Sequence, residues 1–292
     1  MATSVQKQIA KNKRNTVLIM LVFIIFISLI GALFAWLTGD RKILGIFIIV
    51  AVVYAAIQYF LSDKLAILSS GAKRIEQVDN PRYYDIVVEL AETAKIPMPK
   101  VYIINDPAPN AFATGRDPEH ACVAATTGLL EIMDDNELRA VMAHEISHVK
   151  NYDIRLSLIT FGLTALIGLI SDFGLRMLFY ADRDDEDQSP IGVLFAVIVI
   201  VLSPIVASLV QLAVSRQREY LADASSASLT GSAEDMIDAL RKLESQTRPM
   251  RQQNVASESM YITNPLKKSF IGNIFSTHPS IASRIERLKA SK

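Results

Sequence analysis

The chain has 292 residues, 51% of them hydrophobic, and its 30 basic and 30 acidic residues give a net charge of zero. A neutral chain has no overall attraction for nucleic acid, so the composition does not favour a nucleic-acid partner. The hydrophobic content is high for a soluble protein of this length and points to membrane segments. The single cysteine, Cys122, excludes an intrachain disulfide, and we expect it to be a small core residue in a strand.

Two uncharged apolar runs come first, at residues 16–37 and 43–61. Each is long enough to cross the hydrocarbon core of a bilayer, which takes about 20 helical residues. The first run is too long for the apolar part of a secretory signal peptide, and no small-residue cleavage site follows it. We therefore predict an uncleaved membrane anchor with two spans over residues 1–62.

The next segment, residues 63–155, has the pattern of a small domain with helices and strands. Pro81 and the apolar stripe that follows it at helical spacing predict a helix over residues 81–95. Three short β-rich runs come next, and a Gly-Arg-Asp-Pro turn at 115–118 separates the second from the third. The strands are expected at residues 101–104, 111–114 and 121–126.

A helix that begins after Asp134 carries the most informative pattern in the chain. Asp134 and Glu137 have the spacing of a capping box. The sequence H-E-I-S-H begins at position 144, in a chain with only four histidines. Residues four apart share a helix face, so His144 and His148 can bind one metal ion, and Glu145 can take the proton of a water molecule beside it. A pair of solvated helix histidines is the alternative.

Two further apolar runs follow the motif, and they differ in strength. Residues 156–180 are interrupted by Asp172 and Arg176, which are four apart and can pair on one helix face. Residues 191–214 carry no charge and are predicted to span the membrane. The acidic segment 181–190 between them is expected to form a loop. We predict a transmembrane hairpin over residues 156–214 and about four spans in the whole chain.

A catalytic zinc site has three protein ligands and an open position for water, so a third ligand must lie elsewhere in the chain. Glu219 is the best candidate. Asp223, four residues on, shares its helical face and can accept a hydrogen bond from a ligand histidine. An exposed acidic pair on an amphipathic helix is the alternative. If His148 and Glu219 share one zinc ion per chain, the intervening segment crosses the membrane an even number of times, which favours two spans there.

Charge also predicts the orientation in the membrane. Four basic residues and no acidic residue precede the first span: Lys7, Lys11, Lys13 and Arg14. Basic residues favour the cytoplasmic side, so we expect both termini and the metal site there. The catalytic domain would then combine residues 63–155 with residues 215–292. The expected fold is an α+β, zincin-type catalytic domain, mainly helical with a small β-sheet, carried on about four transmembrane helices.

Over nearly its whole length the chain resembles the HtpX family of membrane-bound zinc metalloproteases, which are related to the CAAX prenyl proteases. Besides the H-E-I-S-H and Glu219-x-x-x-Asp223 patterns, the resemblance rests on Asn-Ala-Phe-Ala-Thr-Gly at 110–115, Thr-Gly-Leu-Leu at 127–130 and Thr-His-Pro at 277–279. It implies a zinc endopeptidase at the cytoplasmic face of the inner membrane, acting in quality control of misfolded or damaged membrane proteins. Its partners would be polypeptide substrates and the lipid bilayer.

The resemblance also suggests roles for residues outside the metal site. An edge strand along which an extended substrate would pair is expected at Asn110, Ala111, Phe112 and Ala113. An ordinary strand after a turn is the alternative. His278 and Arg284 match the family's carboxy-terminal His-Pro and Arg positions, and either could stabilise the oxyanion of the tetrahedral intermediate. Their alternative is a helix start at Pro279, with Arg284 in solvent.

Three residues outside these motifs and two alternative functions complete the predictions. His120 has no partner in a motif and is expected to be a surface turn residue. Asn151 and Asp153 follow the metal-binding helix and are expected to buttress its end. One alternative function is a maturation protease of the CAAX type, which has more spans. The other is a non-enzymatic membrane adaptor with a structural zinc, which normally needs a fourth ligand.

Overall fold

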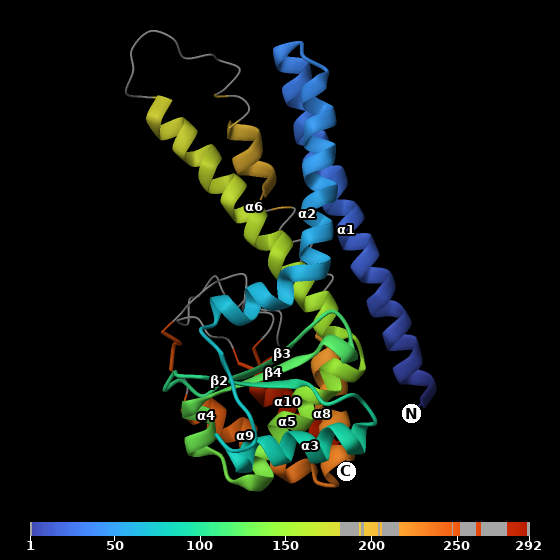
Figure 1. Cartoon of the computed structure of the whole chain (residues 1–292), viewed down its shortest axis with the longest axis vertical. Helices are drawn as coiled ribbons and strands as arrows, with labels where there is room; N and C mark the ends of the chain where they lie inside the picture. Colours follow the sequence, from blue (N-terminus) through green and yellow to red (C-terminus); the bar gives the residue numbers. More distant parts are fainter. Residues whose placement is uncertain are drawn as a thin grey trace.

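The structure, a computed structural model, describes residues 2–181, 193, 196–203, 205, 216–246, 248–251, 261–263 and 279–290. Three long helices, α1 (Ala2–Thr38), α2 (Lys42–Ser69) and α6 (Asp153–Ala181), extend from one side of a smaller soluble part (Figure 1). Within them, Gln6–Thr38, Lys42–Leu61 and Asp153–Asp172 are long and apolar enough to cross a membrane. Long apolar helices are therefore present at the first three predicted spans.

The fourth predicted span is only partly covered by the structure. Residues 196–203 within it are helical, and most of the remaining run lies outside the described residues. The predicted acidic loop falls on residues 182–190, which also lie outside the described residues. The three helices and this fragment are consistent with the predicted architecture of about four spans.

The membrane helices pack on one another through large apolar side chains. Phe23 and Ile27 of α1 are buried together with Ala51 of α2 and with Leu163 and Ile167 of α6. The opposite faces of these helices are apolar as well, and on α1 the exposed side chains include Val17, Leu21, Ile25, Leu29 and Trp36. Exposed apolar bands of this size are unfavourable in water and favourable in lipid. The packing therefore agrees with a membrane location for these helices.

Four short strands form one mixed sheet in the order β1-β2-β4-β3. The strands are β1 (Lys73–Arg74), β2 (Lys100–Ile104), β3 (Ala111–Thr114) and β4 (Cys122–Thr126). β2 and β4 run parallel, and the other two neighbouring pairs are antiparallel. The three predicted strands are confirmed, whereas β1 was not predicted because two residues carry no readable periodicity. Cys122 is buried in β4, as expected for a small core residue.

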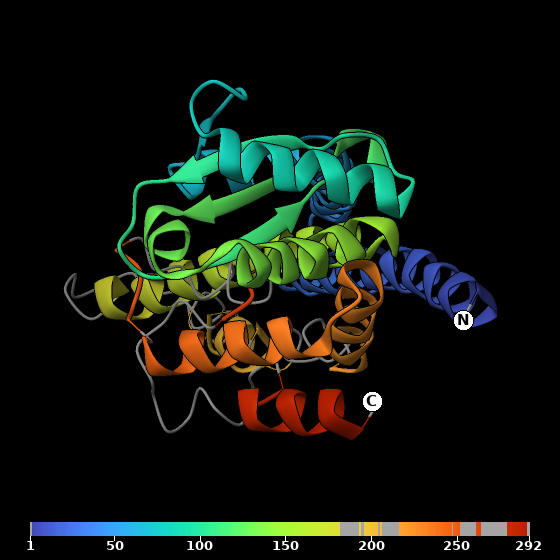
Figure 2. The ribbon, with the colours of Figure 1, turned by 90° about the horizontal axis from the view of Figure 1, so that it is seen from below.

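The described residues of the soluble part also form α-helices. They are α3 (Pro81–Ala94), α4 (Thr127–Ile132), α5 (Asp135–Lys150), α8 (Gln217–Thr230), α9 (Ala233–Ser245) and α10 (Ile281–Ala290). Figure 2 shows α5 in the middle, with the sheet and α3 on one side and α8 and α9 on the other. Apolar side chains of α5, among them Leu138, Val141 and Ile146, lie in the main core. The helices α8 and α9, which follow the predicted fourth span in the sequence, thus pack against the H-E-x-x-H helix.

A capping box begins α5, and a tight turn ends it. The Asp134 carboxylate accepts hydrogen bonds from the backbone N–H groups of Asn136 and Glu137, and the Glu137 carboxylate accepts one from Asp134, which confirms the capping box. At the other end Tyr152 has a positive φ of 61°, a conformation that ends a helix, and α6 begins at Asp153. This turn brings the start of a membrane helix next to the last turn of α5.

Candidate metal centre

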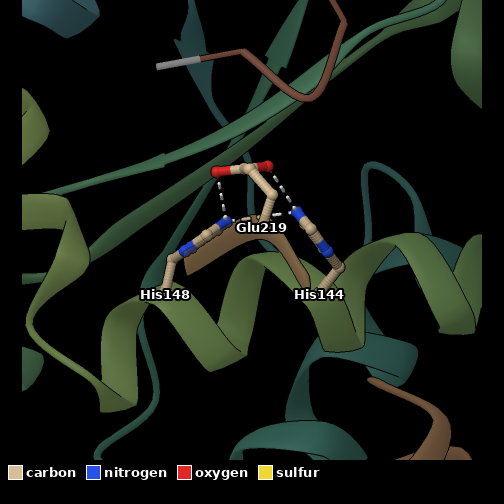
Figure 3. Close-up of side chains that lie close together, drawn as sticks. All are labelled: His144, His148 and Glu219. Carbon is tan, nitrogen blue, oxygen red and sulfur yellow. Dashed lines mark hydrogen bonds and ion pairs between the residues drawn. The ribbon is translucent and has the colours of Figure 1, made fainter. Parts of the chain in front are cut away.

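Three side chains from two helices converge in the soluble part (Figure 3). His144 and His148 project from one face of α5, and Glu219 reaches them from the first turn of α8. The two Nε2 atoms are 3.1 Å apart, and Glu219 oxygens lie 3.6 Å from His144 Nε2 and 3.7 Å from His148 Nε2. Donor atoms of a tetrahedral zinc site with bonds of about 2.0–2.2 Å lie roughly 3.4 Å apart, so this spacing fits one ion.

Each histidine is held from behind by a carboxylate. His144 Nδ1 lies 3.0 Å from Asp223 Oδ1, and His148 Nδ1 lies 3.0 Å from Asp153 Oδ2. A carboxylate accepts hydrogen bonds, so each ring donates through Nδ1 and directs the lone pair of Nε2 toward the common centre. Asp223 therefore occupies the position that the sequence predicted. Asp153, expected only to buttress the helix end, occupies the equivalent position behind His148.

The charges buried around this point favour a divalent cation. Six charged side chains near the histidines are at most 3% exposed: Glu145, Asp153, Arg218, Glu219, Asp223 and Arg284. Four of them are carboxyl groups and two are guanidinium groups, so the site is rich in acidic side chains. A dication bound by the ligands would be stabilised by this excess of carboxyl groups. The space between the side chains measures about 10 Å³, enough for one water-sized occupant.

The same groups shift the pKa values in the site. Burial and the Arg284 guanidinium lower the pKa of His144, but its hydrogen bonds with Asp223 and Glu219 outweigh them and raise that pKa to about 9. A metal ion that binds His144 Nε2 would therefore displace a proton at neutral pH. Burial alone would raise the pKa of Asp223, but the charge and hydrogen bonds of Arg284, together with His144, lower it to about 2. Asp223 therefore stays a carboxylate at neutral pH and remains an acceptor behind His144.

Glu145 lies beside the three convergent side chains. It is 2% exposed and lines the same small space as His144, His148 and Glu219. Burial raises the pKa of its carboxyl group, and the neighbouring histidines only partly offset that rise. A buried carboxyl group next to a site that fits a metal has the properties of a general base and acid.

Arg284 of α10 is 1% exposed, so the alternative prediction of a solvated Arg284 is wrong. Its Nε and Nη2 atoms donate to the two carboxylate oxygens of Asp223, at 2.9 Å and 2.6 Å, and Nη2 lies 3.3 Å from His144 Nδ1. A bidentate pair of this kind fixes both partners. The contact favours a role in positioning Asp223 over the predicted oxyanion role. His278, the other oxyanion candidate, lies outside the described residues.

β3 lies at the edge of the sheet, where the predicted substrate strand would be. Part of its outer edge is paired with another segment of the chain. The Ile262 N–H donates to the Ala111 carbonyl at 2.9 Å, and Phe112 and Tyr261 form an antiparallel bridge. The rings of Phe112 and Tyr261 also meet edge to face, with centroids 5.0 Å apart. Residues 261–263 therefore cover the start of the predicted substrate edge.

The two ends of the predicted substrate strand differ in their surroundings. The Asn110 amide exchanges hydrogen bonds with the backbone of Thr263, its Nδ2 donating at 3.0 Å and its Oδ1 accepting at 3.3 Å. Ala113, at the other end, lines the small space that also contains His144 and Glu145. Because Ala111 hydrogen bonds outward and residues alternate along a strand, the N–H and C=O of Ala113 also point away from β4.

The remaining predicted residues lie around this site. His120 lies in the turn between β3 and β4 with its side chain 43% exposed, and its Nδ1 is 2.6 Å from Asp117, which agrees with a surface turn residue. Asn151 is the C-cap of α5. Arg218 was not singled out by any pattern, yet its Nη1 donates to the Asp153 carbonyl at 3.3 Å. In the sequence, the only indication that Arg218 lies at the site was its position directly before Glu219.

Two histidines from one turn of a helix, a glutamate from a second helix and a neighbouring buried glutamate define a metallopeptidase of the zincin class. Comparison with known families agrees, because the profile of "Peptidase family M48" matches residues 77–292. The chain belongs to peptidase family M48. Together with the three helices that are long and apolar enough to cross a membrane, this makes it a membrane metalloprotease.

Similar proteins extend over nearly the whole chain. A "Protease HtpX homolog" of Tropheryma whipplei (strain Twist) is 51% identical over 281 residues, which are 96% of this chain and 96% of that protein. A "Protease HtpX homolog" of Streptococcus uberis is 46% identical over 293 residues, covering 97% of this chain and 98% of the relative. The resemblance to the HtpX family is therefore confirmed.

A solved structure shares the fold. The crystal structure of S. mikatae Ste24p matches 91% of this chain with a TM-score of 0.51 and 18% sequence identity. This chain spans 62% of the length of that structure. At this level of identity the likeness concerns the arrangement of helices and strands alone.

Proposed function

We propose that the chain is a zinc-dependent endopeptidase whose metal is held by His144, His148 and Glu219. The observation that carries the proposal is the convergence of two Nε2 atoms and one carboxylate, while both Nδ1 atoms face carboxylates behind the rings. In the described part of the chain no fourth His, Cys, Asp or Glu joins this group. Three protein ligands favour a catalytic site over a structural one, which is normally closed by a fourth.

The chemistry divides between the metal and Glu145. A zinc ion, when bound, supplies Lewis acidity that lowers the pKa of a water molecule and polarises a peptide carbonyl. Glu145 accepts the proton of the attacking water and passes it to the leaving amine, as a base and then as an acid. Asp223 and Asp153 hold the two imidazoles, and Arg284 holds Asp223. We therefore propose a positioning role for Arg284 in place of the oxyanion role.

The substrate would lie along β3 as an added strand. The backbone of Ala113 points away from β4 and borders the space that contains Glu145, so a peptide that took the place of residues 261–263 along β3 would have its carbonyl near the metal. Edge pairing uses backbone groups, which every unfolded polypeptide offers. This supports a broad substrate class, namely misfolded or damaged membrane proteins, over a single matured substrate.

The proposed location is the cytoplasmic face of the inner membrane. The support is the cluster of four basic residues before the first span. The start of α6, five residues after His148, supports a metal site near the membrane surface. We assign residues 1–62 to the anchor, 63–155 and 215–292 to the catalytic domain, and 156–214 to a transmembrane hairpin.

The test of this mechanism is the variant Glu145→Gln, purified in detergent without metal and then supplied with zinc. Zinc binding should be unchanged, because the three ligands remain, while cleavage of casein should fall by about 10²–10⁴-fold. Glu92→Gln, on the exposed face of α3, is the matched control and should cleave at the wild-type rate. Wild-type cleavage by zinc-loaded Glu145→Gln would show that another group moves the proton.

A further inference from the structure

The first helix is longer than a membrane span requires. α1 has 37 residues, which at about 1.5 Å per residue is roughly 55 Å, against a hydrocarbon core of about 30 Å. The apolar run begins at residue 16, so the turns before it extend beyond the membrane. Figure 1 shows this amino-terminal end of α1 reaching back beside the soluble part. It therefore can contact the catalytic domain directly.

Asn12 makes that contact. Asn12 is only 1% exposed, although its neighbours Lys11 and Lys13 are exposed. Asn12 Nδ2 donates to Asp153 Oδ1 at 2.5 Å and to the Asn151 carbonyl at 2.9 Å. The Gln8 side chain donates in turn to Asn12 Oδ1 at 2.9 Å, which fixes the orientation of the amide. A buried amide with both ends bonded has one defined position.

A second contact joins α1 to the turn between α5 and α6. The Lys13 ammonium lies 4.4 Å from the ring centroid of Tyr152, the residue with φ of 61° between α5 and α6. A cation over an aromatic face is attracted to it, and a non-glycine residue in the left-handed region needs support from its surroundings. Asn12 and Lys13 together therefore contact three consecutive residues, 151–153, at the junction of the metal-binding helix and the membrane hairpin.

This junction includes a carboxylate of the metal centre. Asp153 Oδ1 accepts the hydrogen bond from the Asn12 amide. The other oxygen, Asp153 Oδ2, lies 3.0 Å from His148 Nδ1. We propose that Asn12 is a positioning residue of the metal centre, whose amide holds Asp153 so that Asp153 orients the imidazole of His148. The proposal rests on the assignment of His148 as a metal ligand. The amino-terminal helix is then part of the catalytic machinery as well as a membrane anchor.

The physical reason lies in the burial of Asp153. Its side chain is 1% exposed, so each oxygen needs a hydrogen bond from the protein. Arg218 Nη1 is 3.9 Å from Oδ1, beyond hydrogen-bond distance, whereas the Asn12 amide is at 2.5 Å. Without Asn12 the carboxylate is free to rotate toward Arg218, and the hydrogen bond that sets the tautomer and direction of His148 weakens. Loss of such outer partners typically lowers metal affinity about 10–100-fold.

The test measures zinc affinity of the full-length protein in detergent by chelator competition. Asn12→Ala should raise the zinc Kd by about 10-fold. It should also shift the absorption bands of the cobalt-substituted protein, because the direction of the His148 ring changes. Ser28→Ala is the matched control, since the Ser28 hydroxyl bonds only the Ile24 carbonyl of its own helix among its described contacts. If Asn12→Ala does not accumulate, Asn12→Ser, which is too short to reach Asp153, takes its place.

A double-mutant cycle decides whether Asn12 acts through Asp153. In an Asp153→Ala background, Asn12→Ala should leave the zinc Kd unchanged, because the carboxylate it holds is gone. Additive losses, or a wild-type Kd and cobalt spectrum in Asn12→Ala, would overturn the proposal. His148→Ala in the same assay separates this failure from a failure of the metal site. A wild-type Kd in His148→Ala would refute the ligand assignment itself.

Discussion

The direction of each ring in the metal centre is set by residues that would not touch the metal. Asp223 and Asp153 lie 3.0 Å from the Nδ1 atoms of His144 and His148, so both Nε2 atoms face inward. Arg284 binds both oxygens of Asp223. These partners are buried, so their hydrogen bonds are strong and their loss is costly. Metal affinity should therefore depend on them as well as on the ligands.

At the residue scale the variant Asp223→Asn tests this dependence. The amide keeps the shape of the carboxylate but loses its charge, so it holds the Nδ1 proton of His144 less firmly and leaves Arg284 without its counterion. The zinc Kd should rise about 10–100-fold, measured by competition with a chelator. Asp85→Asn, at an exposed position of α3, should leave the Kd unchanged. Equal Kd values for the two variants would contradict a positioning role for Asp223.

The sequence predicted the residues whose spacing is local and missed those that depend on packing. His144, His148, Glu219 and Asp223 stand out because residues four apart share a helix face. The pairing of Asp153 with His148 follows from the tight turn at Tyr152, which no residue pattern announces. Asn12 is 141 positions from its partner Asp153, so no spacing rule could connect them.

At the level of secondary structure, the site depends on three elements from separate segments of the chain. α5 supplies both histidines, α8 supplies Glu219, and β3 contributes Ala113 to the lining of the small space beside them. The helices α3 and α5 and the strands β2, β3 and β4 were predicted from periodicity, composition and capping. The order of the strands was not, because the mixed pairing of β2, β4 and β3 is set by tertiary packing. The covering of β3 by residues 261–263 was missed for the same reason.

Peptide substrates with single N-methylated amides test the proposed role of β3. If substrate pairs with the outward-facing backbone of Ala113, methylation of the amide that donates to this strand should lower kcat/KM by about 10-fold or more. Methylation several residues away should have little effect and serves as the control. Equal tolerance at every position would contradict strand pairing, and would indicate that side-chain pockets position the substrate.

At the scale of the whole molecule, the long apolar helices and the soluble part are in direct contact. α1 contacts the α5–α6 turn, and α6 leads directly from the metal-binding helix into the apolar region. The first three spans were predicted from hydropathy, which is the strongest sequence signal for membrane proteins. Their mutual packing, and the contact of α1 with the soluble part, could be found only from the structure.

Labelling of engineered cysteines tests the orientation in the membrane. The native Cys122 gives little background, because it is 5% exposed and burial raises the pKa of its thiol to about 11. In right-side-out vesicles a membrane-impermeant maleimide should label Asp40→Cys, at the exposed turn between α1 and α2. It should label Val78→Cys, at an 85% exposed position before α3, only after permeabilisation. The reverse pattern would place the metal site on the outer face.

The central claim is that His144, His148 and Glu219, from two segments separated by a membrane hairpin, hold one catalytic zinc ion. The most direct measurement is the zinc content of the detergent-solubilised full-length chain and of His148→Ala and Glu219→Ala, after equilibration with zinc and gel filtration. The account predicts one zinc per wild-type chain and a large loss of bound zinc in both variants. Wild-type zinc content in Glu219→Ala would remove Glu219 from the ligands and contradict the assembly of the site from two segments.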